Sequence, residues 1–305
     1  MFDENIDIHE NYLKCYCPNI LKILLKDRTT KKNIIWATND YFEKYFNGYE
    51  PYKEIFVDSI SGLFGNIIQP RISKALVKQI ERTKIKAEVF TPSWICNKQN
   101  NLIDSIWFGR KEVFNIEEGT SWKTIATKID FPDKNKSWKD YIELNRLEIS
   151  CGEAPYLVSR YDNATGKIIQ LKDRVGLLDR KLRVVCENAL SKDEWIDWSI
   201  RAVQSIYGYE YQGDNVLIAR ENILYTYIDY YKEYFKEEPE EKLLLEIAKV
   251  ISWNIWQMDG LTNRPPYFFV KFIHDQNMKE PPLCKIWDWK EKKAIVFNSI
   301  GKKDK

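Results

Sequence analysis

The sequence predicts an α/β protein in which a mainly parallel sheet is preceded by an accessory lobe. From Trp138 onward, short apolar runs alternate with longer segments in which apolar residues recur every three or four positions. The short runs predict strands and the longer segments predict amphipathic helices, and their alternation is typical of a parallel sheet covered by helices. With 305 residues, 44% of them hydrophobic, the chain can bury a sizeable core.

The part before the sheet domain is expected to differ in character. A helix is predicted from Ile72 to about Arg82, because Ile72, Leu76 and Ile80 fall on one helical face. Two apolar runs nearer the start predict strands at residues 20–25 and 33–36. The chain is accordingly divided into an accessory lobe, a helical arm that bears a motif, and the sheet domain: residues 1–82, 83–137 and 138–305.

The sheet domain is predicted to contain a strand–helix–strand–helix–strand series followed by two later strands. Ser191 followed by Glu194 has the spacing of a capping box, which marks the start of a helix. The predicted strands are residues 146–149, 206–209, 251–256, 284–287 and 294–297. The other predicted helices are residues 171–185, 216–231 and 243–250. Such a strand–helix series is the pattern of nucleotide-binding doubly wound folds.

Bulk properties exclude several classes of protein. The chain has 47 Lys and Arg against 45 Asp and Glu, so its net charge of +2 carries no overall nucleic-acid signature. No apolar run reaches the length of a membrane span, and the acidic start does not resemble a secretory leader. Six dispersed cysteines predict reduced thiols in a cytoplasmic protein. His9 and His274 are isolated, which argues against metal or triad chemistry through them.

Three positions have the chemistry of a nucleoside site. In doubly wound folds the ligand lies beyond the carboxyl ends of the strands, and a glycine turn after the first strand allows the backbone to approach it. Cys151-Gly152-Glu153 stands at such a turn. Glu210 ends the second strand, where a carboxylate can accept hydrogen bonds from both ribose hydroxyls. Asp259 ends the third strand, where it can accept from an exocyclic amine.

Each of these features also has an ordinary structural explanation. A Thr-Pro pair before a helix is usually an N-terminal cap, and a Gly-Glu-Ala turn is usually a connection. Glu210 alone is most simply a solvated strand end, and Asp259-Gly260 alone is a common turn. Their joint order along the chain is what favours a ligand site.

The ordered motifs resemble the cofactor half of S-adenosylmethionine-dependent DNA adenine methyltransferases of restriction–modification systems. The resemblance covers roughly residues 87–261 and is carried by Phe90-Thr91-Pro92-Ser93, Leu147 to Leu157, Gly208-Tyr209-Glu210 and Asn254 to Leu261. The accessory lobe before this region also resembles the M (modification) subunits of restriction systems, through residues 24–30 and 33–38. The resemblance implies a Rossmann-like methyltransferase sheet that binds S-adenosylmethionine. The cofactor-binding residues that it implies are Thr91, Pro92, Cys151, Gly152, Glu153, Glu210 and Asp259.

The sequence departs from the family pattern at important positions. Ala154 replaces the second glycine of the first motif and would be strained at a positive φ, which predicts a wider turn. Glu148 stands where the family usually has Asp. The catalytic motif Asp/Asn/Ser-Pro-Pro-Tyr/Phe is matched only by Asn263-Arg264-Pro265-Pro266-Tyr267, which is interpreted as a loop. Arg264 occupies its first position and can only donate hydrogen bonds, so it cannot accept one from a target amine.

The sequence therefore predicts a cofactor-binding component of a DNA adenine methyltransferase whose catalytic residues are unknown. The resemblance implies DNA and a second methyltransferase or restriction subunit as partners, with no membrane and a cytoplasmic location. The alternative is a non-catalytic methyltransferase-like protein that binds DNA or another protein, since a scaffold alone does not establish activity. A third reading is a small-molecule or RNA methyltransferase on the same fold.

Overall fold

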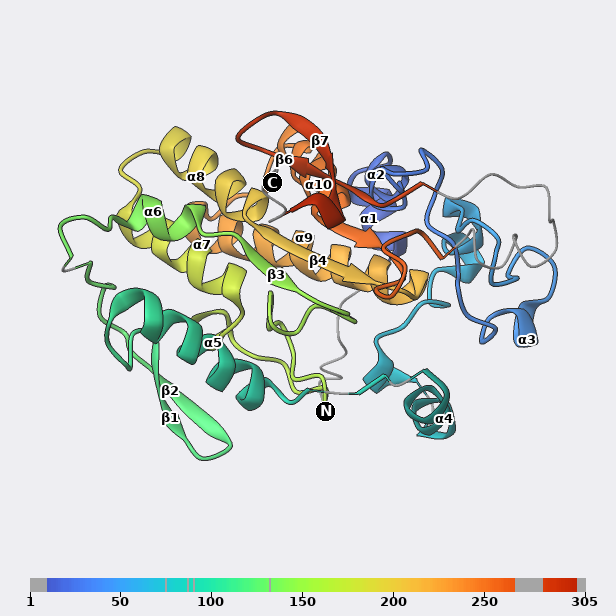
Figure 1. The fold of residues 1–305 in the computed structure, drawn as a ribbon, viewed down its shortest axis with the longest axis horizontal. Coiled ribbons are helices and arrows are strands. Elements are labelled where there is room, and N and C mark those ends of the chain that lie inside the picture. The colour runs from blue at the N-terminus through green and yellow to red at the C-terminus, as the bar shows by residue number, and fades with distance from the viewer. Residues whose placement is uncertain are drawn as a thin grey trace.

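The fold is a three-stranded parallel sheet packed on a long helix, with smaller elements around both (Figure 1). The computed structural model describes residues 10–74, 76–86, 88–89, 91–131, 133–266 and 282–300. In Figure 1 the sheet crosses the middle of the molecule, with the blue N-terminal helices towards one end and α6–α8 towards the other. The α/β class predicted from the sequence is confirmed.

The parallel sheet follows chain order. Its strands are β3 (Arg146–Glu148), β4 (Ile206–Glu210) and β5 (Ile255–Gln257), and β4 lies in the centre. Glu148 is opposite Gly208, and Glu210 is opposite Gln257. Because all three strands run in the same direction, their carboxyl ends meet at one edge of the sheet.

Helices cover one face of this sheet. The longest helix, α9, contacts both β4 and β5 and is buried over most of its length, as its dense apolar pattern requires. The helices of the sheet domain are α6 (Trp138–Glu143), α7 (Leu177–Asn188), α8 (Lys192–Gln204), α9 (Gly213–Phe235) and α10 (Glu241–Asn254). The Ser191 hydroxyl caps α8 by accepting a hydrogen bond from the Glu194 N–H, as predicted. The Glu194 carboxylate accepts a hydrogen bond from the Leu190 N–H and not from the Ser191 N–H that a capping box would use.

The N-terminal region is helical where strands were predicted. Its helices are α1 (Glu10–Tyr16), α2 (Ile20–Leu24), α3 (Phe42–Tyr45) and α4 (Leu76–Lys86). The predicted strand at residues 20–25 is wrong: Ile20, Leu21, Leu24 and Leu25 are all fully buried, and their four-residue steps fit a helix equally well. Residues 33–36 form only isolated bridges, from Asn33 to Lys26 and from Ile35 to Glu54.

Two antiparallel hairpins lie outside the parallel sheet. The first joins β1 (Asn115–Glu118) to β2 (Ser121–Thr124) and follows helix α5 (Ser93–Phe108). The second joins β6 (Lys285–Asp288) to β7 (Lys293–Val296), close to the predicted bounds of these strands. These two strands therefore do not extend the parallel sheet, because β6 pairs with β7 and not with β3, β4 or β5.

Several predicted helices and strands have different bounds in the structure. The helix predicted over 171–185 is a short 3-10 turn, Leu171–Asp173, followed by α7. The helix predicted over 72–82 is likewise a short 3-10 turn, Arg71–Ser73, after which the chain is extended at Lys74, followed by the separate helix α4. The strand predicted over 251–256 is shorter, because residues 251–254 complete α10.

The lobe and the sheet domain share one hydrophobic core. Leu13 and Trp36 from the lobe belong to the same buried cluster as Leu224 and Ile255. At Gly213 the backbones come so close that an added Cβ would lie 1.9 Å from the carbonyl oxygen of Ile35. The Gly213 N–H donates to the carbonyl of Trp36 at 3.0 Å. The domain boundaries at residues 82 and 137 stay predictions.

Candidate functional site

The predicted glycine turn and the predicted acid are neighbours in space. The turn follows β3, and Glu210 ends β4, which pairs with β3. The Gly152 N–H donates to Oε2 of Glu210 at 3.0 Å, and the Cys151 N–H donates to the carbonyl of Tyr209 at 2.8 Å. The parallel pairing of β3 with β4 is what brings these two segments together, although they are 58 residues apart in the chain.

The turn after β3 is held in an uncommon backbone conformation. Ser150, Gly152 and Ala154 have φ values of 48°, 53° and 66°. Only glycine adopts this left-handed region without cost, and strained residues cluster at functional sites. The wider turn predicted from Ala154 is therefore wrong, because Ala154 itself adopts a positive φ. The Ala154 methyl group is fully buried, and the Ala154 N–H donates to the carbonyl of Cys151 at 2.7 Å, which closes the turn tightly.

A cavity of about 530 Å³ opens beside Gly152 and Glu210. Its walls come from four parts of the chain: the turn after β3, the end of β4 with the start of α9, the segment after β5, and the region before α5. The residues that line it are Ala37, Glu88, Val89, Ser150, Gly152, Glu210, Tyr211, Gln212, Asn215, Met258 and Gly260. This volume lies within the range of small-molecule sites.

The charge of the lining selects between ligand classes. Glu88 and Glu210 are the charged residues among those that line the cavity, and neither Lys nor Arg is among them. Phosphate groups need cations or a ring of free N–H donors, so this cavity disfavours a nucleotide phosphate. It suits a neutral nucleoside or a ligand that carries a positive charge.

The Glu210 carboxylate has acceptor capacity left for a ligand. Its Oε1 accepts from the Gln212 N–H at 3.2 Å, and its Oε2 accepts from Gly152. Burial raises the pKa of Glu210, although hydrogen bonds from the backbone N–H groups of Gln212, Gly152 and Tyr211 act in the opposite direction. Each carboxylate oxygen has two lone pairs, so both oxygens can still accept from a diol.

Glu88 and its ion-pair network anchor the wall that the N-terminal region contributes. The Nε of Arg82 donates to Oε2 of Glu88 at 2.6 Å, and Asn215 donates to the other Glu88 oxygen at 2.6 Å. Arg82 also pairs with Asp214 at 3.0 Å, in the first turn of α9. Burial alone would raise the pKa of Asp214, but the charges of Arg82 and Lys74 lower it well below its usual range.

The other predicted site residues lie near the cavity without lining it. The Glu153 carboxylate is buried and accepts from the Arg71 N–H and the Tyr161 hydroxyl, both at 2.6 Å. The Cys151 thiol is buried against Gly208. Asp259 accepts from the Leu261 N–H at 2.8 Å, so its carboxylate caps its own turn, while its neighbours Met258 and Gly260 line the cavity.

Thr91 and Pro92 immediately precede α5, as the Thr-Pro pattern predicts. The Ser93 N–H, in the first turn of that helix, donates to Asp162 at 2.7 Å. Phe90, the first residue of this motif, lies outside the described residues, as does Tyr267. The cofactor roles of Thr91, Pro92, Cys151, Glu153 and Asp259 stay predictions.

Sequence reasoning missed part of the cavity wall. Ala37, Glu88 and Asn215 come from segments to which no ligand role was assigned. The one feature of the sequence that could have pointed to Glu88 is its position three residues before Thr91. Ala37 has a φ of 51°, a feature that the sequence does not show because alanine rarely adopts it.

Gly152→Ala is expected to separate backbone strain from ligand contact. An added Cβ at Gly152 meets nothing within 4 Å, so the cost is that of a left-handed alanine, roughly 1–2 kcal/mol. Gly119→Ala is the matched control, because Gly119 has a φ of 64° and equally open space in the β1–β2 turn. Urea unfolding should show similar losses for both variants. Only Gly152→Ala should weaken ligand binding; equal binding by both would contradict a ligand that contacts this turn.

Comparison with known proteins supplies no relative for this chain. No family model matches it, and neither a curated protein nor a solved structure is significantly similar to it. Within the described part of the chain, no helix is both long and apolar enough to span a membrane. The same residues contain no group of three or more His, Cys, Asp or Glu placed to hold a metal ion.

Proposed function

We propose that this chain is the S-adenosylmethionine-binding component of a DNA adenine methyltransferase of a restriction–modification system. The observation that carries the proposal is the bond from the Gly152 N–H to Glu210 at the rim of a cavity. A glycine turn after one parallel strand and an acid at the end of the next are the two features that hold a nucleoside in doubly wound folds.

The sheet supports a Rossmann-like assignment within this proposal. Its strands β3, β4 and β5 are parallel, adjacent and in chain order, with helices in both connections. This is the arrangement of one half of a doubly wound sheet.

The cavity favours S-adenosylmethionine over phosphate-bearing cofactors. S-adenosylmethionine combines a ribose diol with a sulfonium cation and an ammonium group. Glu210 can accept from the diol, and the acidic lining, with no Lys or Arg, favours the cations. A dinucleotide would bring its pyrophosphate to the same turn, where the Gly152 N–H is already engaged by Glu210.

Catalysis would need a residue from a second polypeptide. In the transfer, the adenine amine attacks the methyl carbon, the carbon–sulfur bond breaks, and the nitrogen then loses a proton to solvent. The amine must be aligned by a hydrogen-bond acceptor. The Arg264 backbone instead closes the turn with Asp259, since the Asp259 N–H donates to its carbonyl at 2.9 Å. We therefore assign DNA and a subunit that supplies the acceptor as partners, in the cytoplasm.

Calorimetry with S-adenosylmethionine tests the proposal. The wild-type chain is expected to bind, and Glu210→Gln is expected to bind at least tenfold more weakly, because hydrogen bonds to a charged acceptor contribute about 1.5–3 kcal/mol. An amide offers one acceptor oxygen where the carboxylate offers two. Glu246→Gln, at an exposed position of α10, is the control. A wild-type chain that does not bind the cofactor would overturn the assignment.

The second candidate is a non-catalytic methyltransferase-like protein that binds DNA or another protein. It is favoured by the position of Arg264 and by β6, which lies in a separate hairpin and not in the parallel sheet. A tritiated methyl-transfer assay on unmodified DNA, with and without the polypeptides encoded beside this chain, separates the two candidates. Transfer by any of these mixtures establishes the enzyme, whereas cofactor binding without transfer supports the non-catalytic protein.

A further inference from the structure

One face of the parallel sheet carries aromatic side chains. Tyr209 of β4 lies opposite Trp256 of β5, and side chains alternate between the faces along a strand, so Tyr207 lies on the same face. Ile255, on the other face, belongs to the main core. Trp256 belongs instead to a separate small cluster that includes Ile286 of β6. The β6–β7 hairpin therefore packs against the aromatic face.

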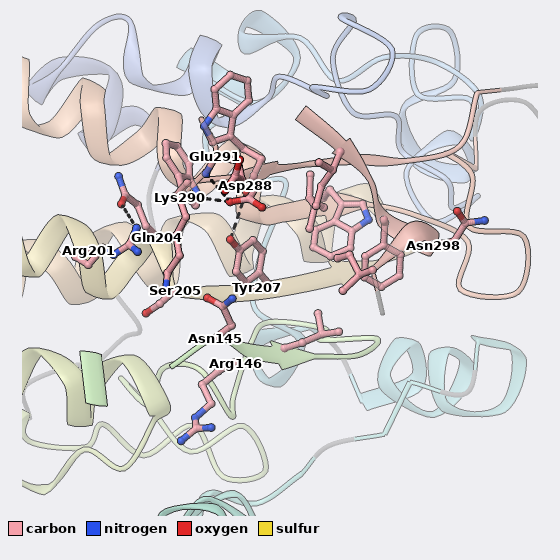
Figure 2. A pocket seen from close by; sticks show the side chains of 18 residues that line it. Asn145, Arg146, Arg201, Gln204, Ser205, Tyr207, Asp288, Lys290, Glu291 and Asn298 are labelled. Atoms are coloured by element: carbon pink, nitrogen blue, oxygen red, sulfur yellow. Dashed lines mark hydrogen bonds between the residues drawn. The ribbon is translucent and has the colours of Figure 1, made fainter. Parts of the chain in front are cut away.

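A cavity of about 640 Å³ lies between this face and the hairpin (Figure 2). Five of its eighteen lining residues are aromatic, namely Tyr207, Trp256, Trp287, Trp289 and Phe297. The ring centroids of Trp256 and Phe297 are 4.9 Å apart, so these two rings form a continuous apolar wall. The cavity shares no lining residue with the Glu210 cavity. Its volume lies within the range of small-molecule sites.

The positive charges at this cavity are directed away from its aromatic rings. Arg201 contacts Glu143, which does not line the cavity, at 3.0 Å. The Lys290 ammonium lies 3.4 Å from the same carboxylate, and the Lys290 side chain is 62% exposed, so solvent screens its charge. Figure 2 shows Arg146 pointing away from the cavity. These cations therefore do not fill the space between the rings.

Asp288 brings a carboxylate without a balancing cation to the cavity. Its Oδ1 accepts from the backbone N–H groups of Lys290 and Glu291, at 2.9 Å and 3.0 Å, which fixes the side chain in the β6–β7 turn. Lys293 lies opposite Asp288 in the hairpin but pairs with Glu291. Within the described part of the chain, no Lys or Arg forms an ion pair with Asp288, so its Oδ2 can still accept from a ligand.

The Asp288 carboxylate lies close to the ring of Tyr207. The Tyr207 hydroxyl donates to the carbonyl of Trp287, the residue before Asp288, at 3.3 Å, and Figure 2 shows this bond beneath the carboxylate. Burial raises the pKa of Tyr207 to about 12, and the charge of Asp288 acts in the same direction. The phenol thus stays neutral near pH 7, and its ring can contact a cation without ionising.

We infer that the cavity between the sheet and the β6–β7 hairpin binds an organic ammonium ion, whose charged head group contacts the aromatic rings and the Asp288 carboxylate. Aromatic faces attract a cation most strongly where water is excluded, and a nearby carboxylate adds to this attraction. Ile286 and Ile295 also line the cavity and would contact an apolar body joined to the head group. An anionic ligand is disfavoured, because it would bring a second negative charge to Asp288.

Choline tests this site against its neutral isostere dimethylbutanol, in which carbon replaces the ammonium nitrogen. The two molecules have the same shape, so a difference in affinity reports the charge. Line broadening of their methyl signals in proton magnetic resonance, titrated with the full chain, measures both dissociation constants. Choline is expected to bind roughly tenfold more tightly than the alcohol. Asp288→Asn keeps the Oδ1 acceptor of the turn and should weaken choline binding roughly tenfold, with the alcohol unaffected.

Glu291→Gln is the matched control, because it removes the same charge from the same hairpin. The Glu291 carboxylate already pairs with Lys293 at 3.7 Å, and its side chain is 65% exposed, so choline binding should change by less than about twofold. Equal losses in Asp288→Asn and Glu291→Gln would overturn the role of Asp288. Alcohol binding as tight as that of choline, or no saturable choline binding by the wild type, would overturn the ammonium site.

This site and the proposed function are tested independently. Glu210→Gln should bind choline like the wild type, and Asp288→Asn should bind S-adenosylmethionine like the wild type, because the two cavities have no lining residue in common. Loss of choline binding in Glu210→Gln would place choline in the Glu210 cavity and overturn the inference. Failure of the wild type to bind S-adenosylmethionine would overturn the proposed function and leave the choline result standing.

Discussion

Arg82→Met is expected to cost about 3–5 kcal/mol of folding stability, because it removes one partner from a buried ion-pair network. Arg82 is 1% exposed and contacts Asp40 at 2.5 Å, Glu88 at 2.6 Å and Asp214 at 3.0 Å. Without the guanidinium, these carboxylates keep only part of the positive charge that compensates their burial. Urea unfolding followed by circular dichroism measures the loss.

The control for this variant is Lys78→Met on the same helix, α4. Lys78 pairs with Glu43 and Glu81, but its side chain is 38% exposed, and exposed pairs contribute about 0–1 kcal/mol. Adding Asp214→Asn to Arg82→Met should cost less than the sum of the single changes, since the two residues interact directly. A loss below about 1 kcal/mol for Arg82→Met would show that the network does not hold α4 against α9.

Glu221→Gln is expected to stabilise the protein at pH 8 and to have little effect near pH 4. Glu221 lies inside α9 and faces Glu10 of α1, and neither carboxylate has a hydrogen-bond partner among the described residues. Burial raises the pKa of Glu10 to about 8, and burial together with the charge of Glu10 raises the pKa of Glu221 well above its usual value.

The direction of this pH dependence follows from proton binding. Above pH 4.5 the unfolded chain releases both protons, while in the folded protein Glu10 retains its proton until the pH approaches 8. Burial favours the protonated form of Glu221 in the same direction. The folded state then binds more protons than the unfolded state, so stability falls as pH rises through this window. Glutamine cannot ionise, so the stability of the variant does not fall with pH by the part that Glu221 contributes in the wild type.

Thermal unfolding of wild type and variant across pH 4.5–8.5 measures the effect. Glu233→Gln is the control, because Glu233 lies on the same helix with a side chain that is 68% exposed. The difference between Glu221→Gln and the wild type should widen steadily with pH. A constant difference at all values would mean that Glu221 does not take up a proton on folding.

Elements with a long or clear period were predictable from the sequence. Helix α9 and strand β4 fall where their patterns place them, and the Ser191 cap marks the start of α8. Helix α2 was predicted as a strand because a short apolar run, interrupted only by Lys22, does not distinguish the helical period from the strand period. Its helical state depends on packing against α10, which lies more than 200 residues further along the chain.

The apolar face predicted for α4 shows a second limit. Ile72 packs against the core as expected, but Leu76 is 69% exposed and Ile80 is 47% exposed. Periodicity indicates which residues share a face, and it does not say whether another part of the chain covers that face. In α4 the side that holds the helix in place is the one with Arg82, through ion pairs instead of apolar burial.

The sequence alone determined the α/β class, the order of strands and helices from β3 to β5, and the two residues, Gly152 and Glu210, that meet at the strand ends. These follow from local periodicity and from the rule that parallel strands end at one edge. Tertiary structure decided the rest: the cavity wall from Ala37 and Glu88, the turned-away carboxylates of Glu153 and Asp259, and the aromatic cavity between the sheet and the β6–β7 hairpin. The physical reason is that local pattern sets backbone conformation, whereas the environment of a side chain depends on which distant segments pack against it.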